Sequence, residues 1–177
     1  MRRSSCSGFW SVCYSGYYAV SNWTVTDNAG GTVDTSSSPT AITLTSGNSQ
    51  VAGDTFFTII APSAETISFN WSYVTNDLWG ESGTDAFGYV LNGVVTTLIN
   101  PNQDFTLPNQ TGITSFTVNA GDVFGFDANT TDGFYGSSVT SVSNFSAVPL
   151  PGALWFFTAA LAGLAGLCRR QPFKAKF

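Results

Sequence analysis

The stretch TISFNWSY, from Thr66 to Tyr73, alternates strictly between small polar residues and large apolar ones. Successive side chains of a β-strand point to opposite faces, so this spacing puts all the large side chains on one face. The pattern predicts a strand with one face buried in a core and the other towards solvent. The residues predicted to be buried are Ile67, Phe69, Trp71 and Tyr73, and those predicted to face outwards are Ser68, Asn70 and Ser72.

Similar short segments recur on both sides of this stretch, separated by Gly, Pro, Asn or Asp, and no helical period lasts beyond one turn. Asn92-Gly93 predicts a two-residue hairpin because both positions tolerate a positive φ, and Pro62-Ser63 predicts a second turn. We therefore expect an all-β domain over residues 17–147, an antiparallel two-sheet sandwich with an aromatic core. The predicted strands are 17–26, 41–45, 55–61, 65–73, 87–91, 94–98, 113–118, 123–126 and 138–145.

Basic residues are confined to the two ends of the 177-residue chain. The stretch from Ser4 to Cys168 contains all eleven acidic residues and no Lys, Arg or His. It therefore has no side-chain cation to form a salt bridge, to hold a phosphate or to serve in Ser-His-Asp or Cys-His catalysis. It would also repel nucleic acid, whose binding depends on Lys and Arg. We expect no enzymatic activity and no nucleic-acid partner.

Carboxylates are the reactive groups that remain in this stretch. A glycosidase needs two of them across a cleft, and Glu65 and Glu81 are the only Glu residues. Glu65 falls in a predicted tight turn, which is a poor place for a buried acid. A carboxylate-based glycosidase is therefore the alternative that the sequence favours least.

Acidic residues also gather in the loop that follows TISFNWSY. Oxygen ligands in a flexible loop suit Ca²⁺, and no basic residue lies nearby to relieve the repulsion among the acids. Asp127 and Asp132 are candidates to contribute from a neighbouring loop. The spacing is not that of an EF-hand, and a solvated acidic loop is the alternative interpretation. The predicted calcium ligands are Asp77, Glu81 and Asp85.

An apolar segment of 17 residues, Gly152 to Cys168, follows the β-rich domain and carries no charge. As a helix it would be about 25 Å long, the short end of what spans a bilayer. Arg169 and Arg170 follow it directly, and basic residues that flank a span stay cytoplasmic. The pattern predicts a single C-terminal transmembrane helix with the acidic domain outside, and a buried core helix is the alternative.

The order of features at this end is specific. Val148-Pro149-Leu150-Pro151, then a span rich in Trp and Phe, then Arg169-Arg170, resembles the PEP-CTERM sorting signal of exported proteins from Gram-negative, exopolysaccharide-producing bacteria. The resemblance implies recognition by exosortase, a membrane cysteine transpeptidase, and removal of the anchor near the Pro-x-Pro motif. The chain departs from the family in having Leu150 where the name-giving form has Glu, and in a seven-residue tail after Arg170.

The opposite end does not match this signal. Residues 1–16 begin with basic residues but never offer seven consecutive apolar ones, so we expect an atypical or truncated N-terminal segment. Cys6 and Cys13 are free to pair in principle, and their spacing matches no familiar metal site. Residues 148–177 form the predicted sorting signal, which leaves residues 17–147 as the folded domain.

The order of motifs in the domain, from GDTFFTIIAPSAETISFNWSY to SVTSVSNFSA, is similar to a CUB-like or jelly-roll module of secreted bacterial proteins. The resemblance implies a fold, and CUB-like modules often hold Ca²⁺ between loops at one end of the sandwich. We expect a protein of the bacterial cell envelope or the extracellular space that associates with exopolysaccharide, with Trp79 as the stacking residue for sugar rings. A purely structural matrix protein without a ligand is the alternative.

Overall fold

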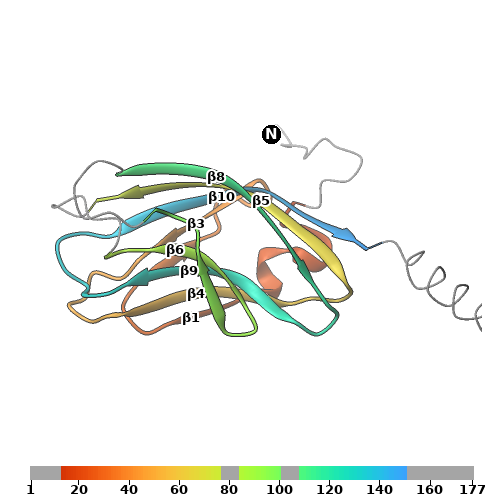
Figure 1. Ribbon diagram of the computed structural model, residues 1–177, viewed down its shortest axis with the longest axis horizontal. Helices are drawn as coiled ribbons and strands as arrows, with labels where there is room; N and C mark the ends of the chain where they lie inside the picture. Colours follow the sequence, from red (N-terminus) through yellow and green to blue (C-terminus); the bar gives the residue numbers. More distant parts are fainter. Residues whose placement is uncertain (1–12, 77–83, 101–107, 151–177) are drawn as a thin grey trace, which may run out of the picture.

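Two five-stranded sheets pack face to face in the computed structural model, which describes residues 13–76, 84–100 and 108–150 (Figure 1). One sheet has the strand order β1-β4-β9-β6-β7 and the other β2-β3-β10-β5-β8, and every strand pairing is antiparallel. The predicted antiparallel two-sheet sandwich is confirmed. The strands are β1 (Thr24–Asp27), β2 (Thr32–Asp34), β3 (Ala41–Thr45), β4 (Gly53–Ile60), β5 (Glu65–Thr75), β6 (Phe87–Leu91), β7 (Val94–Thr97), β8 (Asn109–Val118), β9 (Val123–Thr130) and β10 (Ser138–Pro149).

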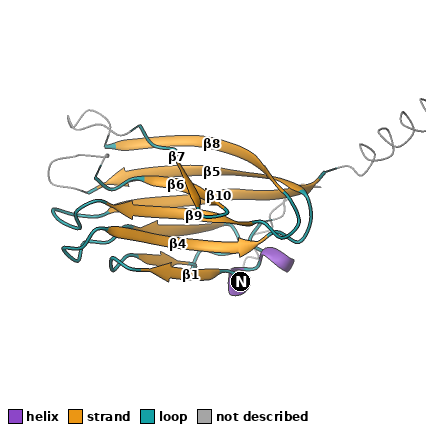
Figure 2. Ribbon diagram, turned by 60° about the horizontal axis from the view of Figure 1, so that its bottom comes forward, coloured by secondary structure: helices purple, strands orange, loops and turns teal. Residues whose placement is uncertain are grey.

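Helical structure among the described residues is limited to two single turns of 3₁₀-helix before β1, η1 (Gly16–Tyr18) and η2 (Val20–Asn22) (Figure 2). The described residues contain no helix long and apolar enough to cross a membrane. The predicted span at 152–168 and the arginine pair after it lie outside the described residues.

Strand β5 carries the TISFNWSY stretch and lies between β10 and β8 in its sheet. The four large side chains that the alternation assigns to the core are all buried, with exposed fractions of 8% or less. Their polar neighbours in the sequence lie on the opposite face and are partly or fully exposed. The prediction from the period-two pattern is therefore confirmed residue by residue.

Aromatic side chains fill the space between the sheets, as expected from the sequence. Trp23 stacks on Phe57 and Phe126, with ring centroids 4.9 Å and 5.7 Å apart. Tyr14 stacks on Phe145 at 5.0 Å. The core thus includes a residue that precedes the expected start of the domain at residue 17.

The predicted strand at 17–26 is wrong over most of its length. Asn22 donates a side-chain hydrogen bond to the carbonyl of Tyr17 (2.9 Å), and the indole nitrogen of Trp23 donates to the carbonyl of Tyr18 (3.1 Å). These local bonds favour turns over a strand ladder, so strand structure begins only at Thr24. The short edge strand β2 was not predicted.

The burial of Glu65 also differs from the expectation, which was that its turn is a poor place for a buried acid. Its side chain is 4% exposed at the start of β5. The hydroxyl of Tyr18 donates to Oε2 at 2.5 Å and the hydroxyl of Ser63 donates to Oε1 at 2.6 Å. Burial, together with the hydrogen bond and the charge of Glu65, raises the pKa of Tyr18. Two hydroxyl donors thus replace the water that the carboxylate loses on burial.

The last strand runs past the expected boundary at residue 147. Val148 pairs with Thr66 and Pro149 pairs with Glu65, so two residues of the predicted sorting motif belong to β10. The backbone nitrogen of Leu150 then donates to the carbonyl of Ala64 at 2.9 Å.

Candidate functional site

The face of the β1-β4-β9-β6-β7 sheet that points away from the core, called the outer face below, carries the candidate site. Along β9, Phe124, Phe126 and Ala128 point into the core. The residues between them point the other way, because side chains alternate along a strand. These residues, Val123, Gly125, Asp127 and Asn129, form the centre line of the outer face.

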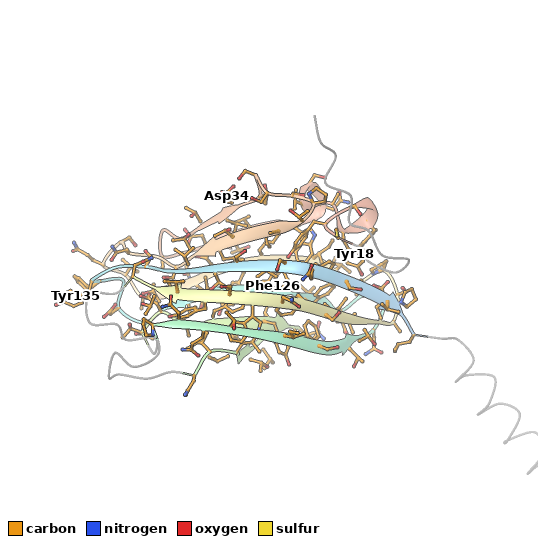
Figure 3. All side chains as sticks on the ribbon, turned by 90° about the horizontal axis from the view of Figure 1, so that it is seen from above. Tyr18, Asp34, Phe126 and Tyr135 are labelled. Atoms are coloured by element: carbon orange, nitrogen blue, oxygen red, sulfur yellow. The ribbon has the colours of Figure 1, made fainter. Side chains whose placement is uncertain are left out.

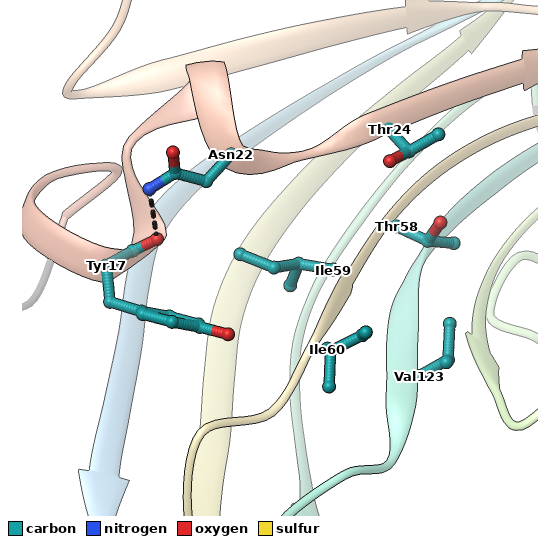
Figure 4. A pocket seen from close by; sticks show the side chains of 7 residues that line it. All are labelled: Tyr17, Asn22, Thr24, Thr58, Ile59, Ile60 and Val123. Atoms are coloured by element: carbon teal, nitrogen blue, oxygen red, sulfur yellow. Dashed lines mark hydrogen bonds between the residues drawn. The ribbon is translucent and has the colours of Figure 1, made fainter.

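One end of the outer face holds a hollow of about 330 Å³, called the tyrosine hollow (Figure 4). Tyr17 forms one wall with its ring half-exposed, at 50% of its surface. The hydrogen bond from Asn22 to the Tyr17 carbonyl fixes the turn that carries this ring. The lining residues are Tyr17, Asn22, Thr24, Thr58, Ile59, Ile60 and Val123.

A second hollow of about 180 Å³, the middle hollow, continues from the first and shares Thr58 and Val123 with it. Phe56 contributes an aromatic ring here and is only partly buried. Gly93, from the β6–β7 turn, has a φ of 81° and Asn92 has a φ of 51°, so the predicted two-residue hairpin is confirmed. The turn therefore brings its own backbone to the edge of this hollow.

A third hollow of about 240 Å³, the acidic hollow, lies next along the sheet. The strand register places it there, because Phe56 of the middle hollow pairs with Asp127 and Gly88 pairs with Asp127 on the other side. Gly88 has no side chain, and the space that a Cβ would take there is filled by the backbone of Thr96 and the side chain of Val95. The lining residues are Asp54, Ala86, Phe87, Gly88, Val95, Thr97, Asp127 and Asn129.

Two carboxylates meet in the acidic hollow. Asp54 pairs with Asn129 in the β4–β9 register, and the side-chain nitrogen of Asn129 donates to Asp54 Oδ1 at 2.8 Å. Asp127 is a diagonal neighbour of Asp54 on the same face. Its side chain is 2% exposed, and its Oδ1 is buried without a hydrogen-bond partner among the described residues. Burial first, and the charge of Asp54 second, raise the pKa of Asp127 to about 7.

This pair does not have the geometry of a glycosidase. Such an enzyme places its two carboxyl groups on either side of the scissile bond. Asp54 and Asp127 stand side by side on neighbouring strands of one sheet face. The arrangement can accept hydrogen bonds from hydroxyl groups or hold a cation, because carboxylate and amide oxygens are acceptors and hard-metal ligands.

The predicted calcium loop is only partly within the described residues. Asp77, Trp79 and Glu81 lie outside them, so that site stays a prediction. Asp85 is fully buried, and its Oδ1 accepts a hydrogen bond from the Ser46 hydroxyl at 3.0 Å.

Asp127 and Asp132, the two acids expected to contribute to that calcium site from a neighbouring loop, do not lie on the same element. Asp127 is a strand residue of the outer face, and Asp132 accepts a bond from the backbone nitrogen of Phe134 at 2.9 Å. In the part of the chain that the structure describes, no group of three or more His, Cys, Asp or Glu residues comes together.

A second candidate binding surface lies at the tip of the β9–β10 loop (Figure 3). Phe134 and Tyr135 are 42% and 56% exposed, with ring centroids 6.0 Å apart. Tyr135 has a φ of 66°, which is unusual for a bulky residue. The loop is held by the backbone nitrogen of Gly133, which donates to the Thr130 hydroxyl at 2.9 Å.

Sequence reasoning did not find that Tyr17, Asp54, Asp127 and Asn129 line hollows of the same sheet face. The signal that was available lies in VFGFDANT, where the apolar residues of one face alternate with Asp127 and Asn129 on the other. That pattern places the two residues on one face of a strand. It does not say which residue of another strand faces them.

No protein-family model and no curated protein matches the sequence. Solved structures similar to this chain include carbohydrate-binding modules. TmCBM61, solved in complex with β-1,4-galactotriose, is 9% identical with a TM-score of 0.43, over 81% of this chain and all of that one. A family 35 module from Clostridium thermocellum is 12% identical with a TM-score of 0.37, over 70% and 92% of the two chains. CBM35 from Cellvibrio japonicus Abf62 is 20% identical with a TM-score of 0.34, over 58% and 70%. At these values the likeness does not assign a ligand to this chain.

Proposed function

We propose that this protein binds polysaccharide without modifying it, along the three hollows of the outer face. The observation that supports this is the order in which three kinds of side chain follow one another along the outer face. An exposed tyrosine ring stands at one end, a phenylalanine in the middle, and a carboxylate–amide cluster at the other end. A sugar ring has an apolar face that stacks on aromatic rings and a rim of hydroxyls that donate to carboxylates and amides. The outer face offers both kinds of contact in one row.

The strand scaffold favours binding over catalysis. The groups of the outer face are set by strand register and lie on one wall, which suits an extended chain laid along the sheet. Sites built on strands hold their geometry better than sites on loops. With no Lys, Arg or His from Ser4 to Cys168, recognition would rest on hydrogen bonds and stacking, so we expect neutral polysaccharides to bind better than acidic ones.

The test is affinity electrophoresis of the full chain, in mild detergent, through gels that contain neutral or acidic polysaccharides. We expect retardation by at least one neutral polysaccharide, and a loss of most of it in Tyr17→Ala. Ile113→Ala is the matched control, because Ile113 is 78% exposed on the outward face of the other sheet. Equal retardation of Tyr17→Ala, Ile113→Ala and the natural chain would place binding elsewhere.

Two further variants locate the binding surface if the Tyr17→Ala result excludes the hollows. Trp79→Ala examines the stacking residue predicted from the sequence, and Tyr135→Ala examines the exposed pair at the β9–β10 tip. A protein that binds none of the polysaccharides in any form would instead be a structural matrix component without a ligand.

Export and anchoring belong to the same proposal. We take residues 148–177 as a PEP-CTERM sorting signal read by an exosortase-type transpeptidase, with the sandwich on the outer side of the membrane and the protein in the cell envelope or released from it. The motif Val148-Pro149-Leu150-Pro151 and the pair Arg169-Arg170 support this. Replacement of Pro149, Leu150 and Pro151 by alanine should leave the full-length chain in the membrane fraction. Recovery of the natural full-length chain from the soluble cytosol would contradict the proposal.

The finer fold assignment also stays a proposal. Apart from the β6–β7 hairpin, consecutive strands from β3 onward lie in opposite sheets, so that β3-β10-β5-β8 and β4-β9-β6-β7 each form four neighbours. This winding supports the jelly-roll class, with β1 and β2 added at one edge of each sheet.

A further inference from the structure

We propose that the acidic hollow binds a hard divalent cation such as Ca²⁺, held by the carboxylates of Asp54 and Asp127 with the side-chain oxygen of Asn129. Its ligands differ from Asp77, Glu81 and Asp85, the calcium ligands predicted from the sequence. It lies on the strands of the outer face and not in a loop at the end of the sandwich.

The first reason is the state of Asp127. A carboxylate that is 98% buried normally has hydrogen-bond donors around it, since leaving one without a partner is costly. No donor among the described residues reaches Asp127 Oδ1, although the side chain of Asp127 lines the acidic hollow. A group that the protein itself does not satisfy, aimed into a hollow, points to a ligand from outside.

The second reason is the absence of compensating charge. Asp54 is a diagonal neighbour of Asp127 across the β4–β9 pair, and both residues line the acidic hollow. Buried like charges are normally offset by a basic side chain or a metal. None of the described residues is a Lys, Arg or His that could do this, so among them a proton or an external cation is the counter-charge that remains.

The third reason is the set of donor atoms. Asn129 gives its side-chain N–H to Asp54, which leaves the amide oxygen as an acceptor. The other polar group in the lining is the Thr97 hydroxyl. Only oxygen donors are offered, which suits Ca²⁺ and excludes the softer metals that prefer sulfur or imidazole. The hollow, about 240 Å³, has room for a cation with several of its waters.

Two carboxylates and an amide make a weak site. We expect a dissociation constant on the order of 10⁻⁴–10⁻³ M, the range of extracellular calcium modules.

The test is a thermal-unfolding titration of the full chain in mild detergent with CaCl₂, repeated with MgCl₂, at pH 8 after treatment with a chelator. We expect a rise in Tm of about 5 °C at ten times the dissociation constant. The rise should disappear in Asp127→Asn and in Asp54→Asn, and persist in Asp34→Asn, which changes an exposed acid on β2. It should also persist in the double variant Asp77→Asn/Glu81→Gln, which removes the predicted loop ligands.

An unchanged rise in both Asp127→Asn and Asp54→Asn would overturn the proposal, as would a rise that is lost only in the loop variant. Circular dichroism establishes that each variant is folded. If one of the two fails to fold, the other still decides. No polysaccharide is present in this assay, so its result is independent of glycan binding.

Discussion

The charge on Asp127 should make the protein less stable as the pH rises through neutrality. In the unfolded chain this carboxyl ionises near 3.8, whereas in the folded protein burial and Asp54 raise its pKa to about 7. Between these two values the folded state binds more protons than the unfolded state. The free energy of unfolding therefore falls with rising pH in this window and is flat, for this group, above and below it.

The size of the effect follows from the two pKa values. A difference of about 3 units corresponds to about 4 kcal/mol in all, at about 1.4 kcal/mol per unit. Between pH 5 and pH 8 the expected loss is about 2.7 kcal/mol, because part of the window lies below pH 5. This is a large share of the stability of a typical domain.

The perturbation is Asp127→Asn, which keeps the shape of the side chain and cannot ionise. Urea unfolding of both proteins is followed by tryptophan fluorescence at pH 5, 6, 7 and 8, with a chelator present. The variant should be less sensitive to pH by about 2.7 kcal/mol across this range, and more stable than the natural chain at pH 8. Asp34→Asn is the control and should keep the natural pH dependence. Parallel curves for the natural chain and Asp127→Asn would refute the reasoning, since no titration would then be linked to folding at this residue.

Three further substitutions test the packing that positions the outer face, each by urea unfolding. Trp23→Ala should cost about 3–5 kcal/mol, because its ring lies between the sheets in contact with several aromatic neighbours; a cost below 1 kcal/mol would contradict the stacked core. Gly125→Ala should cost about 1–3 kcal/mol, because a Cβ there would overlap the carbonyl oxygen of Phe57; an unchanged midpoint would contradict this close approach of β4 and β9. Glu65→Gln should cost about 1.5–3 kcal/mol, because two hydroxyls donate to a buried charge; an unchanged midpoint would mean that these bonds do not form in solution.

The sheet structure could be predicted from the sequence wherever a local rule was strong. The alternation in TISFNWSY identified which side of β5 is buried, and Asn92-Gly93 identified the β6–β7 turn. Both signals depend only on neighbours in the chain, namely side-chain alternation and tolerance of positive φ. The two sheets and the aromatic core follow from the same alternation repeated along the chain.

The prediction was wrong where side-chain hydrogen bonds, one of them long-range and two of them local, decide the structure. Glu65 looks like a turn residue until the hydroxyl of Tyr18, from a segment 47 positions away, is found to pair with it. The segment around Trp23 reads as a strand, but its side-chain bonds to the backbone of the preceding turn hold it in 3₁₀ geometry. The long-range partner cannot be read from a single sequence because nothing in the local pattern names it. The two local bonds, each to a carbonyl five residues earlier, depend on a turn geometry that the apolar pattern does not indicate.

The same limit explains why the acidic hollow was not predicted. Asp127 and Asn129 are nevertheless recognisable in the sequence as the polar positions of an alternating strand. The strand predicted at 123–126 stopped before Asp127 because Asp is depleted in strands and common in turns. In the structure β9 continues to Thr130 and carries Asp127 at a buried position. A strand that keeps an ionisable residue there, without a donor or counter-charge of its own, breaks a local rule at a cost in stability. Such costs are expected where a ligand compensates them. The position at which the prediction of β9 failed, Asp127, is therefore the position at which a ligand is most to be expected. The calcium titration and the pH series are two independent measurements on that residue.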